Sequence, residues 1–306
     1  MAYRPAHTGE QPVRAGRRRL SRDERLAYLI LLPALAAVFA IVTIPFVLVI
    51  IQSLSTQDGT FVGSINYSRA LGNPLLYEAI RSTGVYTLIV LPIEILLGLG
   101  FALLVHRTVR RVGLRAAIYV LAIMPLVVPP VAIGVVARLI YAPGYGVLNV
   151  ILDRIGIMHQ EINWLGDPTL AMLAVASVDV WQWTPFVYLV LFSGLQTVPR
   201  ESVEAAQLDG AGGWAQFRYI DLHYLRPLFV LIIFFRLADV LRVFDHVFIL
   251  TGGGPGTATQ LLSLYMYRVE FKFFDTGQAA ALAVVVLVSF SLLYALIARV
   301  LPLERA

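Results

Sequence analysis

Residues 199–227 read PRESVEAAQLDGAGGWAQFRYIDLHYLRP, a polar segment between two long apolar runs. Its first half favours a helix, because Glu201 and Glu204 complement the positive end of a helix dipole and two strong helix formers, both alanines, follow. Gly210 is the residue type that adopts a left-handed conformation and ends helices. Apolar side chains then recur at spacings of three from 214 to 220. The segment therefore predicts two short helices inside a connection.

Composition places the chain among membrane proteins. It has 306 residues, 58% of them hydrophobic and 14% charged, with a mean hydropathy of +0.77. A soluble domain carries about 25% charged residues. The formal net charge of +5 does not indicate a nucleic-acid partner, because the arginines gather at the ends of apolar runs, next to membrane lipid.

Six apolar runs reach the roughly 20 residues that a membrane-spanning helix needs. The first run is too long for the core of a signal peptide and lacks a small-residue cleavage site, so we expect it to be retained. The sequence predicts an all-α, polytopic membrane protein with six transmembrane helices in one transmembrane domain over 26–306. An Arg-rich tail over 1–25, which we expect to be disordered, precedes it. The runs lie at about 27–52, 82–105, 116–140, 169–195, 225–250 and 277–301.

Arginine distribution predicts the orientation. The excess of arginine lies in the N-terminal tail, after the second run, in the 199–227 segment and at the C-terminus. Because cytoplasmic loops carry such an excess, we expect both termini and the 199–227 segment in the cytoplasm, with the chain crossing the plasma membrane several times.

Motifs for covalent chemistry are missing from the sequence. The glycines at 252–256 lack the lysine of a phosphate-binding loop. The five histidines show no metal-binding spacing, no nucleophile-elbow pattern occurs, and there is no cysteine. We therefore expect no enzyme activity, metal or cofactor in this chain, and any ATPase that drives it must lie on another chain.

The polar segment resembles the EAA loop of bacterial ABC-importer permeases. The matching residues are Glu204, Ala205, Ala206, Asp209, Gly210 and Ala211. A second stretch, LTGGGPGTAT at 250–259, resembles the carbohydrate-uptake branch of that family, of the maltose-permease type, as does NWLGDPT at 163–169. One departure is His223, where the family usually has a proline. Another is the absence of the large extracytoplasmic insertion of the enteric maltose permease.

This resemblance implies an ABC type I importer permease and its partners. These are a second permease subunit, a dimer of ATP-binding subunits that holds ATP and Mg, and an extracytoplasmic sugar-binding protein. The six EAA-loop residues would dock into a cleft of the ATP-binding subunit. The alternative for this segment is an amphipathic helix at the membrane surface. Gly253, Gly254 and Pro255 are candidates for contact with the binding protein.

Ionisable residues inside apolar runs are the next candidates, because such residues usually face a partner or a water-filled path. Arg236, Asp239, Arg242 and Asp245 recur in the fifth run at steps of three, within pairing reach on a helix. They form either a self-neutralising ladder or, for Arg236 and Asp239, part of a translocation cavity that binds sugar hydroxyls. Glu94 and Arg138 are lone charges for which we expect structural partners.

The fourth run combines aromatic and planar polar side chains, the two kinds that bind sugars. An aromatic belt at the membrane surface is the alternative, but the cluster lies near the middle of its run. Resemblance to the maltose type implies substrate contacts in the third, fourth and fifth runs. Those positions are Leu126 and Pro130, then Asp179, Gln182, Trp183 and Phe186, then Arg236 and Val240. Pro125, Pro129 and Pro130 predict a break in the third helix, which is tolerated where it lines a cavity.

We therefore expect a permease subunit of an ATP-driven importer for a carbohydrate, a disaccharide such as trehalose, which works by alternating access. The whole chain also resembles the permeases of mycobacterial trehalose importers. One alternative is an ABC permease for glycerol phosphate or another charged solute, with arginines as phosphate ligands. Another is a membrane-integral enzyme or ion channel, against which the EAA loop argues.

Overall fold

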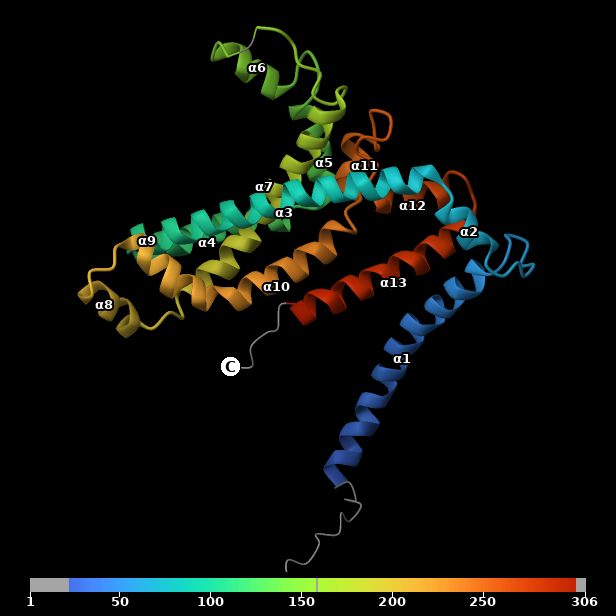
Figure 1. The fold of residues 1–306 in the computed structure, drawn as a ribbon, viewed down its shortest axis with the longest axis horizontal. Coiled ribbons are helices and arrows are strands. Elements are labelled where there is room, and N and C mark those ends of the chain that lie inside the picture. Colours follow the sequence, from blue (N-terminus) through green and yellow to red (C-terminus); the bar gives the residue numbers. More distant parts are fainter. Residues whose placement is uncertain (1–21, 158, 301–306) are drawn as a thin grey trace, which may run out of the picture. The chain divides into compact units, whose positions relative to one another are not determined.

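The computed structural model describes residues 22–157 and 159–300, and every element assigned there is a helix (Figure 1). Residues 1–21 of the tail expected to be disordered lie outside the described residues. The chain divides into two units, Met1–Val49 and Ile50–Ala306. The first unit contributes most of helix α1 (Arg22–Ser53), and the second contributes the remaining helices.

Four helices of the described residues are long and apolar enough to cross a membrane. They are α1, α3 (Pro74–Thr108), α7 (Pro168–Leu195) and α13 (Thr276–Val300), which match the first, second, fourth and sixth predicted runs. A fifth span is formed if α4 (Val112–Val127) and α5 (Pro130–Ile140) count together. The all-α membrane fold is confirmed, whereas the number of six spans stays a prediction.

The predicted break in the third run is confirmed. α4 and α5 meet at an angle of 91°. Val128 is extended there, with ψ 126°, because a residue that precedes a proline disfavours the helical conformation. The Val128 carbonyl, which has left the helical ladder, accepts a hydrogen bond from Gln182 Nε2 of α7 at 3.2 Å. Pro125 lies within α4 and does not end it.

The fifth run differs from its prediction as one helix over about 225–250. α10 (Leu222–Val240) ends at Val240, and a separate short helix, α11 (Asp245–Leu250), follows. Asp245 lies in the first turn of α11, where an acidic side chain favours a new helix start. The 19 residues of α10 include three charged side chains, Arg226, Arg236 and Asp239, and α10 is not among the four candidate spans.

α3 and α7 begin with the same local signal and pack along each other. Asn73 and Asp167 accept hydrogen bonds from backbone N–H groups of the first turn, at 3.0 Å and 2.9 Å, and a proline follows each cap. Both features favour a helix start. Where the helices cross, a Cβ on Gly98 would lie only 2.6 Å from Val187 Cγ1, so glycine permits the close approach.

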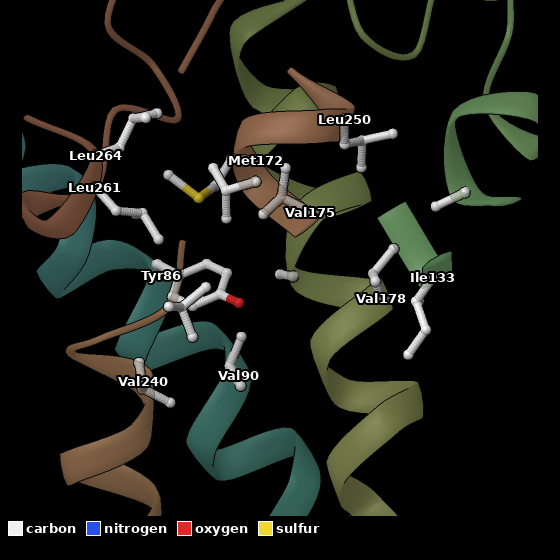
Figure 2. Packing of buried hydrophobic residues seen from close by; sticks show 14 residues of the cluster. Tyr86, Val90, Ile133, Met172, Val175, Val178, Val240, Leu250, Leu261 and Leu264 are labelled. Atoms are coloured by element: carbon white, nitrogen blue, oxygen red, sulfur yellow. The ribbon is translucent and has the colours of Figure 1, made fainter. Parts of the chain in front are cut away.

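One buried apolar cluster joins α3 and α7 to the end of α10 and to the segments that follow it (Figure 2). Short helices lie in the connections of the second unit: α2 (Ile65–Leu71), α6 (Val147–Arg154) and α12 (Leu262–Phe271). The labelled members of the cluster are Tyr86, Val90, Ile133, Met172, Val175, Val178, Val240, Leu250, Leu261 and Leu264.

The segment 199–227 contains the helices that its sequence predicts. α8 (Arg200–Leu208) is followed by Gly210 with φ +81°, the left-handed conformation expected at a helix end. The chain re-enters a helical conformation as α9 (Gly213–Gln216) and continues as the π-helix η1 (Phe217–Asp221) directly into α10.

Candidate functional site

Arg236 of α10 lies at the centre of a buried charge cluster. Its Nε donates to Glu94 Oε2 and its Nη2 to Glu94 Oε1, both at 2.7 Å, which makes a two-pronged pair with α3. Nη2 also donates to Asp179 Oδ2 of α7 at 2.8 Å, and Nη1 donates to Asp239 Oδ2 at 2.6 Å. The cluster thus joins three helices, α3, α7 and α10.

Burial makes this cluster dependent on its internal pairing. Glu94 and Asp179 are fully buried, Arg236 is 1% exposed, and only Asp239, with 30% of its side chain exposed, reaches the surface. A charge so far from water is stable only when it is paired and hydrogen-bonded. Because three carboxylates surround one guanidinium, the cluster has a formal excess of negative charge.

An aromatic side chain covers the guanidinium. The Arg236 Cζ lies 4.6 Å from the centroid of the Trp183 ring, within the range of a cation–π contact. Phe186 meets Trp183 edge-on, with centroids 6.0 Å apart. Trp183 therefore packs between the charge cluster and a second aromatic side chain of the same helix.

A cavity of about 100 Å³ borders this cluster. Two acceptor atoms of its walls, Asp179 Oδ1 and Gln182 Oε1, are buried and accept no well-aligned hydrogen bond from the described residues, although the Tyr86 hydroxyl lies near the Asp179 carboxylate. Arg236 and Glu94 lie behind the wall and do not line the cavity. The lining residues are Pro130, Asp179, Gln182, Trp183, Asp239, Arg242, Val243, Phe244, Asp245 and His246.

The structure brings together five of the predicted substrate-binding residues at this cavity: Pro130, Asp179, Gln182, Trp183 and Asp239. The other four lie outside its lining. Val240 is buried in the apolar cluster of Figure 2, and Phe186 packs against a second apolar cluster. Leu126 is half-buried in α4, and the three nitrogens of the Arg236 guanidinium all bind carboxylates.

Glu94 was expected to have a structural partner, and the structure identifies that partner as Arg236. Its position next to the substrate-binding candidates was not predicted. The sequence feature that could have indicated this position is that Glu94 is the lone acidic residue of the second apolar run. The self-neutralising ladder is only partly formed. Arg236 binds Asp239 at 2.6 Å, but the next pair, Arg242 Nη2 and Asp239 Oδ1, is 3.8 Å apart. Asp245 lies beyond the end of α10, in α11.

A larger cavity, of about 790 Å³, lies between α3, α4 and α7. Its walls are mainly apolar and include Leu97, Phe101, Leu121 and Trp181. The two cavities share no lining residue. On α7, the side chain of Trp181 points to the larger cavity and that of Trp183 to the smaller one. Of these two cavities, only the smaller one is lined by charged side chains.

The EAA-like residues form one exposed corner. Glu204, Ala205, Asp209 and Gly210 are exposed, and Ala206 and Ala211 are half-buried. Ala211 N donates to Ala206 O at 2.8 Å, which folds the chain back on the end of α8. The two small alanines beside Glu204 leave the backbone of α8 accessible.

The glycine-rich loop 252–256 has the opposite character, because its own chain holds it. Arg268 Nη2 donates to Gly252 O at 2.5 Å, and Thr259 Oγ1 donates to Gly254 O at 2.8 Å. Gly253 is buried with φ +93°, and a Cβ there would lie 2.9 Å from Leu264 Cδ2. Gly254 and Pro255 are half-buried. The loop therefore has a fixed shape.

Comparisons with known proteins agree on one family. The family model described as "Binding-protein-dependent transport system inner membrane component" matches residues 94–303. The trehalose/maltose transport system permease protein MalF of Thermococcus litoralis is 34% identical over 91% of this chain and 95% of its own length. The sulfoquinovosyl glycerol transport system permease protein SmoG of Agrobacterium fabrum is 34% identical over 86% of each chain.

The fold is similar to a solved transporter. The crystal structure of a bacterial ABC transporter involved in the import of the acidic polysaccharide alginate matches with a TM-score of 0.81. The match covers 93% of this chain and 98% of that chain, at 21% sequence identity.

Proposed function

Since the chain belongs to the family of binding-protein-dependent transport system inner membrane components, we propose that it is the permease of an importer for a neutral carbohydrate, a disaccharide such as trehalose. Members of this family are membrane-embedded permease subunits of ABC transporters, so the chain is a transporter subunit and not an enzyme. The sugar, the route and the coupling are our proposals.

The observation that carries the proposed substrate is the pairing of acceptor oxygens with an aromatic ring at one cavity. Asp179 Oδ1 and Gln182 Oε1 are acceptors that receive no well-aligned hydrogen bond from the described residues. Sugar hydroxyls are donors, and the C–H faces of a sugar ring pack on an aromatic face such as that of Trp183. A few placed polar groups and an aromatic wall are typical of a small-molecule site, and the cavity of about 100 Å³ would form part of a larger site that the second permease completes.

The names of relatives support a sugar. MalF of Thermococcus litoralis is named for trehalose and maltose, and SmoG of Agrobacterium fabrum for sulfoquinovosyl glycerol. We therefore test trehalose first as the substrate, as expected for an importer of the mycobacterial kind.

Arg242 favours a second candidate, a permease for glycerol phosphate or another charged solute. Its side chain is 76% exposed and lines the cavity. Its Nε donates to Ala238 O and its Nη2 lies 3.8 Å from Asp239 Oδ1, so Nη1 is the nitrogen that would approach an anion. Arg236 does not support this alternative, because its guanidinium is already bound by three carboxylates.

We also propose how the subunit is driven. Glu204, Ala205, Ala206, Asp209, Gly210 and Ala211 dock on an ATP-binding subunit, which holds ATP and Mg as part of a dimer. ATP binding closes that dimer, and the movement of α8 switches the cavity from outward-facing to inward-facing. A second permease completes the pathway, the sugar-binding protein docks outside at Gly253, Gly254 and Pro255, and the termini are cytoplasmic. This chain itself needs no cofactor.

An uptake competition assay tests the proposed function. Cells that lack or express this chain, together with its partner subunits, take up radiolabelled trehalose in the presence of maltose, glycerol phosphate or amino acids. We expect expression-dependent uptake that only related disaccharides block. Entry of glycerol phosphate without trehalose would retain the transporter architecture, overturn the sugar and assign Arg242 to anion binding.

A further inference from the structure

We propose that Glu94 is a positioning residue for substrate recognition: it fixes Arg236 as a counter-ion behind the cavity wall, so that Asp179 and Asp239 face the cavity as acceptors for substrate hydroxyls. This inference rests on the proposed function, since it concerns the same cavity. Glu94 itself does not line the cavity and would not touch the substrate.

The geometry of the Glu94–Arg236 pair fixes the guanidinium plane. Two parallel hydrogen bonds of 2.7 Å join the Nε–Nη2 edge of Arg236 to both oxygens of Glu94. A carboxylate that meets a guanidinium in this two-pronged way fixes its orientation as well as its position. Because Glu94 is on α3 and Arg236 is on α10, the pair also fixes the Arg236 side chain relative to another helix.

The remaining donors of Arg236 then orient the cavity wall. Nη2 binds Asp179 Oδ2 and Nη1 binds Asp239 Oδ2, which leaves the second oxygen of each carboxylate outside the contacts of Arg236. Asp239 Oδ1 lies 3.8 Å from Nη2 of Arg242, which also lines the cavity. The second oxygen of Asp179, Oδ1, accepts no well-aligned hydrogen bond from the described part of the chain. Asp179 is fully buried and lines the cavity. Trp183 packs against the same guanidinium at 4.6 Å. One arginine thus holds three cavity-lining side chains.

This arrangement selects a class of substrate. The wall offers acceptor oxygens of Asp179 and Gln182, and its three carboxylates, Asp179, Asp239 and Asp245, outnumber its one arginine, Arg242. It therefore suits an uncharged polyhydroxyl compound that supplies donors, and it disfavours an anion. The alternative is that Glu94 serves folding alone. The Glu94–Arg236 pair would then neutralise buried charge and would not affect which substrate hydroxyls are recognised.

The test measures recognition as a ratio that does not depend on the amount of protein. Cells that carry the complete importer with either native Glu94 or Glu94→Gln take up radiolabelled trehalose and a panel of monodeoxy trehalose analogues, each lacking one hydroxyl. The sugar-binding protein is the same in both strains, so its own preference cancels. Glu78→Gln is the matched control, because Glu78 is an exposed carboxylate on the same helix α3.

We expect Glu94→Gln to reduce the preference for trehalose over at least one analogue by about tenfold, because a misaligned acceptor no longer distinguishes a hydroxyl from its absence. Glu78→Gln should leave every ratio unchanged. Unchanged ratios in Glu94→Gln, at any level of total uptake, would overturn the inference. If Glu94→Gln is not recovered in the membrane, the same ratios are measured for Glu94→Asp. This variant keeps the negative charge but has a side chain that is shorter by one methylene. A changed ratio supports the inference, and unchanged ratios overturn it.

Failure of the proposed function gives a different result. If the importer with native Glu94 takes up neither trehalose nor its analogues, the substrate is wrong. If it takes them up with preferences that do not respond to residue 94, the substrate stands and the positioning role fails.

Discussion

Arg107 at the end of α3 is bound to Asp221 of η1, although 114 positions separate them in the chain. The Arg107 Nη2 donates to Asp221 Oδ2 at 3.3 Å and to Gly213 O at 3.1 Å. The second half of the 199–227 segment is therefore attached to the same helix that carries Glu94.

Arg107→Gln should weaken coupling between ATP hydrolysis and uptake. The variant removes the counter-ion of Asp221, whose side chain is buried. Because the Arg107 side chain is partly exposed to solvent, the ion pair contributes about 1 kcal/mol or less to holding the segment on α3. We expect the amount of trehalose taken up per ATP hydrolysed to fall by up to about fivefold in the reconstituted importer. Arg110→Gln, a change at an exposed arginine of the same connection, is the control. Equal ratios in both variants would show that the contact does not contribute to coupling.

Glu204→Lys should leave the protein inserted and abolish productive docking. Glu204 is exposed on α8, so the change disturbs no internal contact of the described chain but reverses the charge of the proposed docking surface. We expect uptake to fall by about tenfold or more while basal ATP hydrolysis persists, measured side by side in proteoliposomes. Glu161→Lys makes the same change at an exposed residue of another connection. Normal uptake by Glu204→Lys would contradict the docking role.

Trp183→Ala should impair transport, whereas Trp181→Ala should not. Trp183 lines the small cavity and packs on Arg236, while Trp181 is 54% exposed and lines the apolar cavity. Loss of the aromatic face should reduce trehalose uptake about three- to tenfold without loss of assembled complex. The measurement is the initial rate of uptake divided by the amount of complex in the membrane. If the two variants behave alike, Trp183 has only a packing role.

Gly98→Ala should destabilise the packing of α3 on α7. The added Cβ would lie 2.6 Å from Val187 Cγ1 and 2.9 Å from Tyr188 N, and a backbone atom cannot move away as a flexible side chain can. We expect a loss of about 1–3 kcal/mol, seen as a lower unfolding temperature of the purified complex. Gly84→Ala is the matched control on the same helix, because its Cβ meets nothing within 4 Å. That variant should be neutral or slightly more stable, since alanine favours helices by up to about 1 kcal/mol.

Local signals explain what the sequence predicted well. The bounds of α7 follow from Asp167 and Pro168 at its start and from the length of an apolar run, all of which neighbouring residues specify. The break between α4 and α5 follows from the conformational limits of Pro129 and Pro130, and the end of α8 from Gly210. The fifth run was less predictable, because its hydropathy continues past Val240 although the helix does not.

The sequence by itself therefore determined the membrane class, the four long apolar helices and the polar connection at 199–227, because chain-local hydropathy, caps and turn residues specify them. Only the tertiary structure decided which polar residues meet. Glu94 and Arg236 are 142 positions apart, and no local pattern indicates that α3 and α10 bring them to 2.7 Å. Four of the five N–H donors of Arg236 are bound to carboxylates within the protein, which makes its guanidinium a buried counter-ion of the cluster.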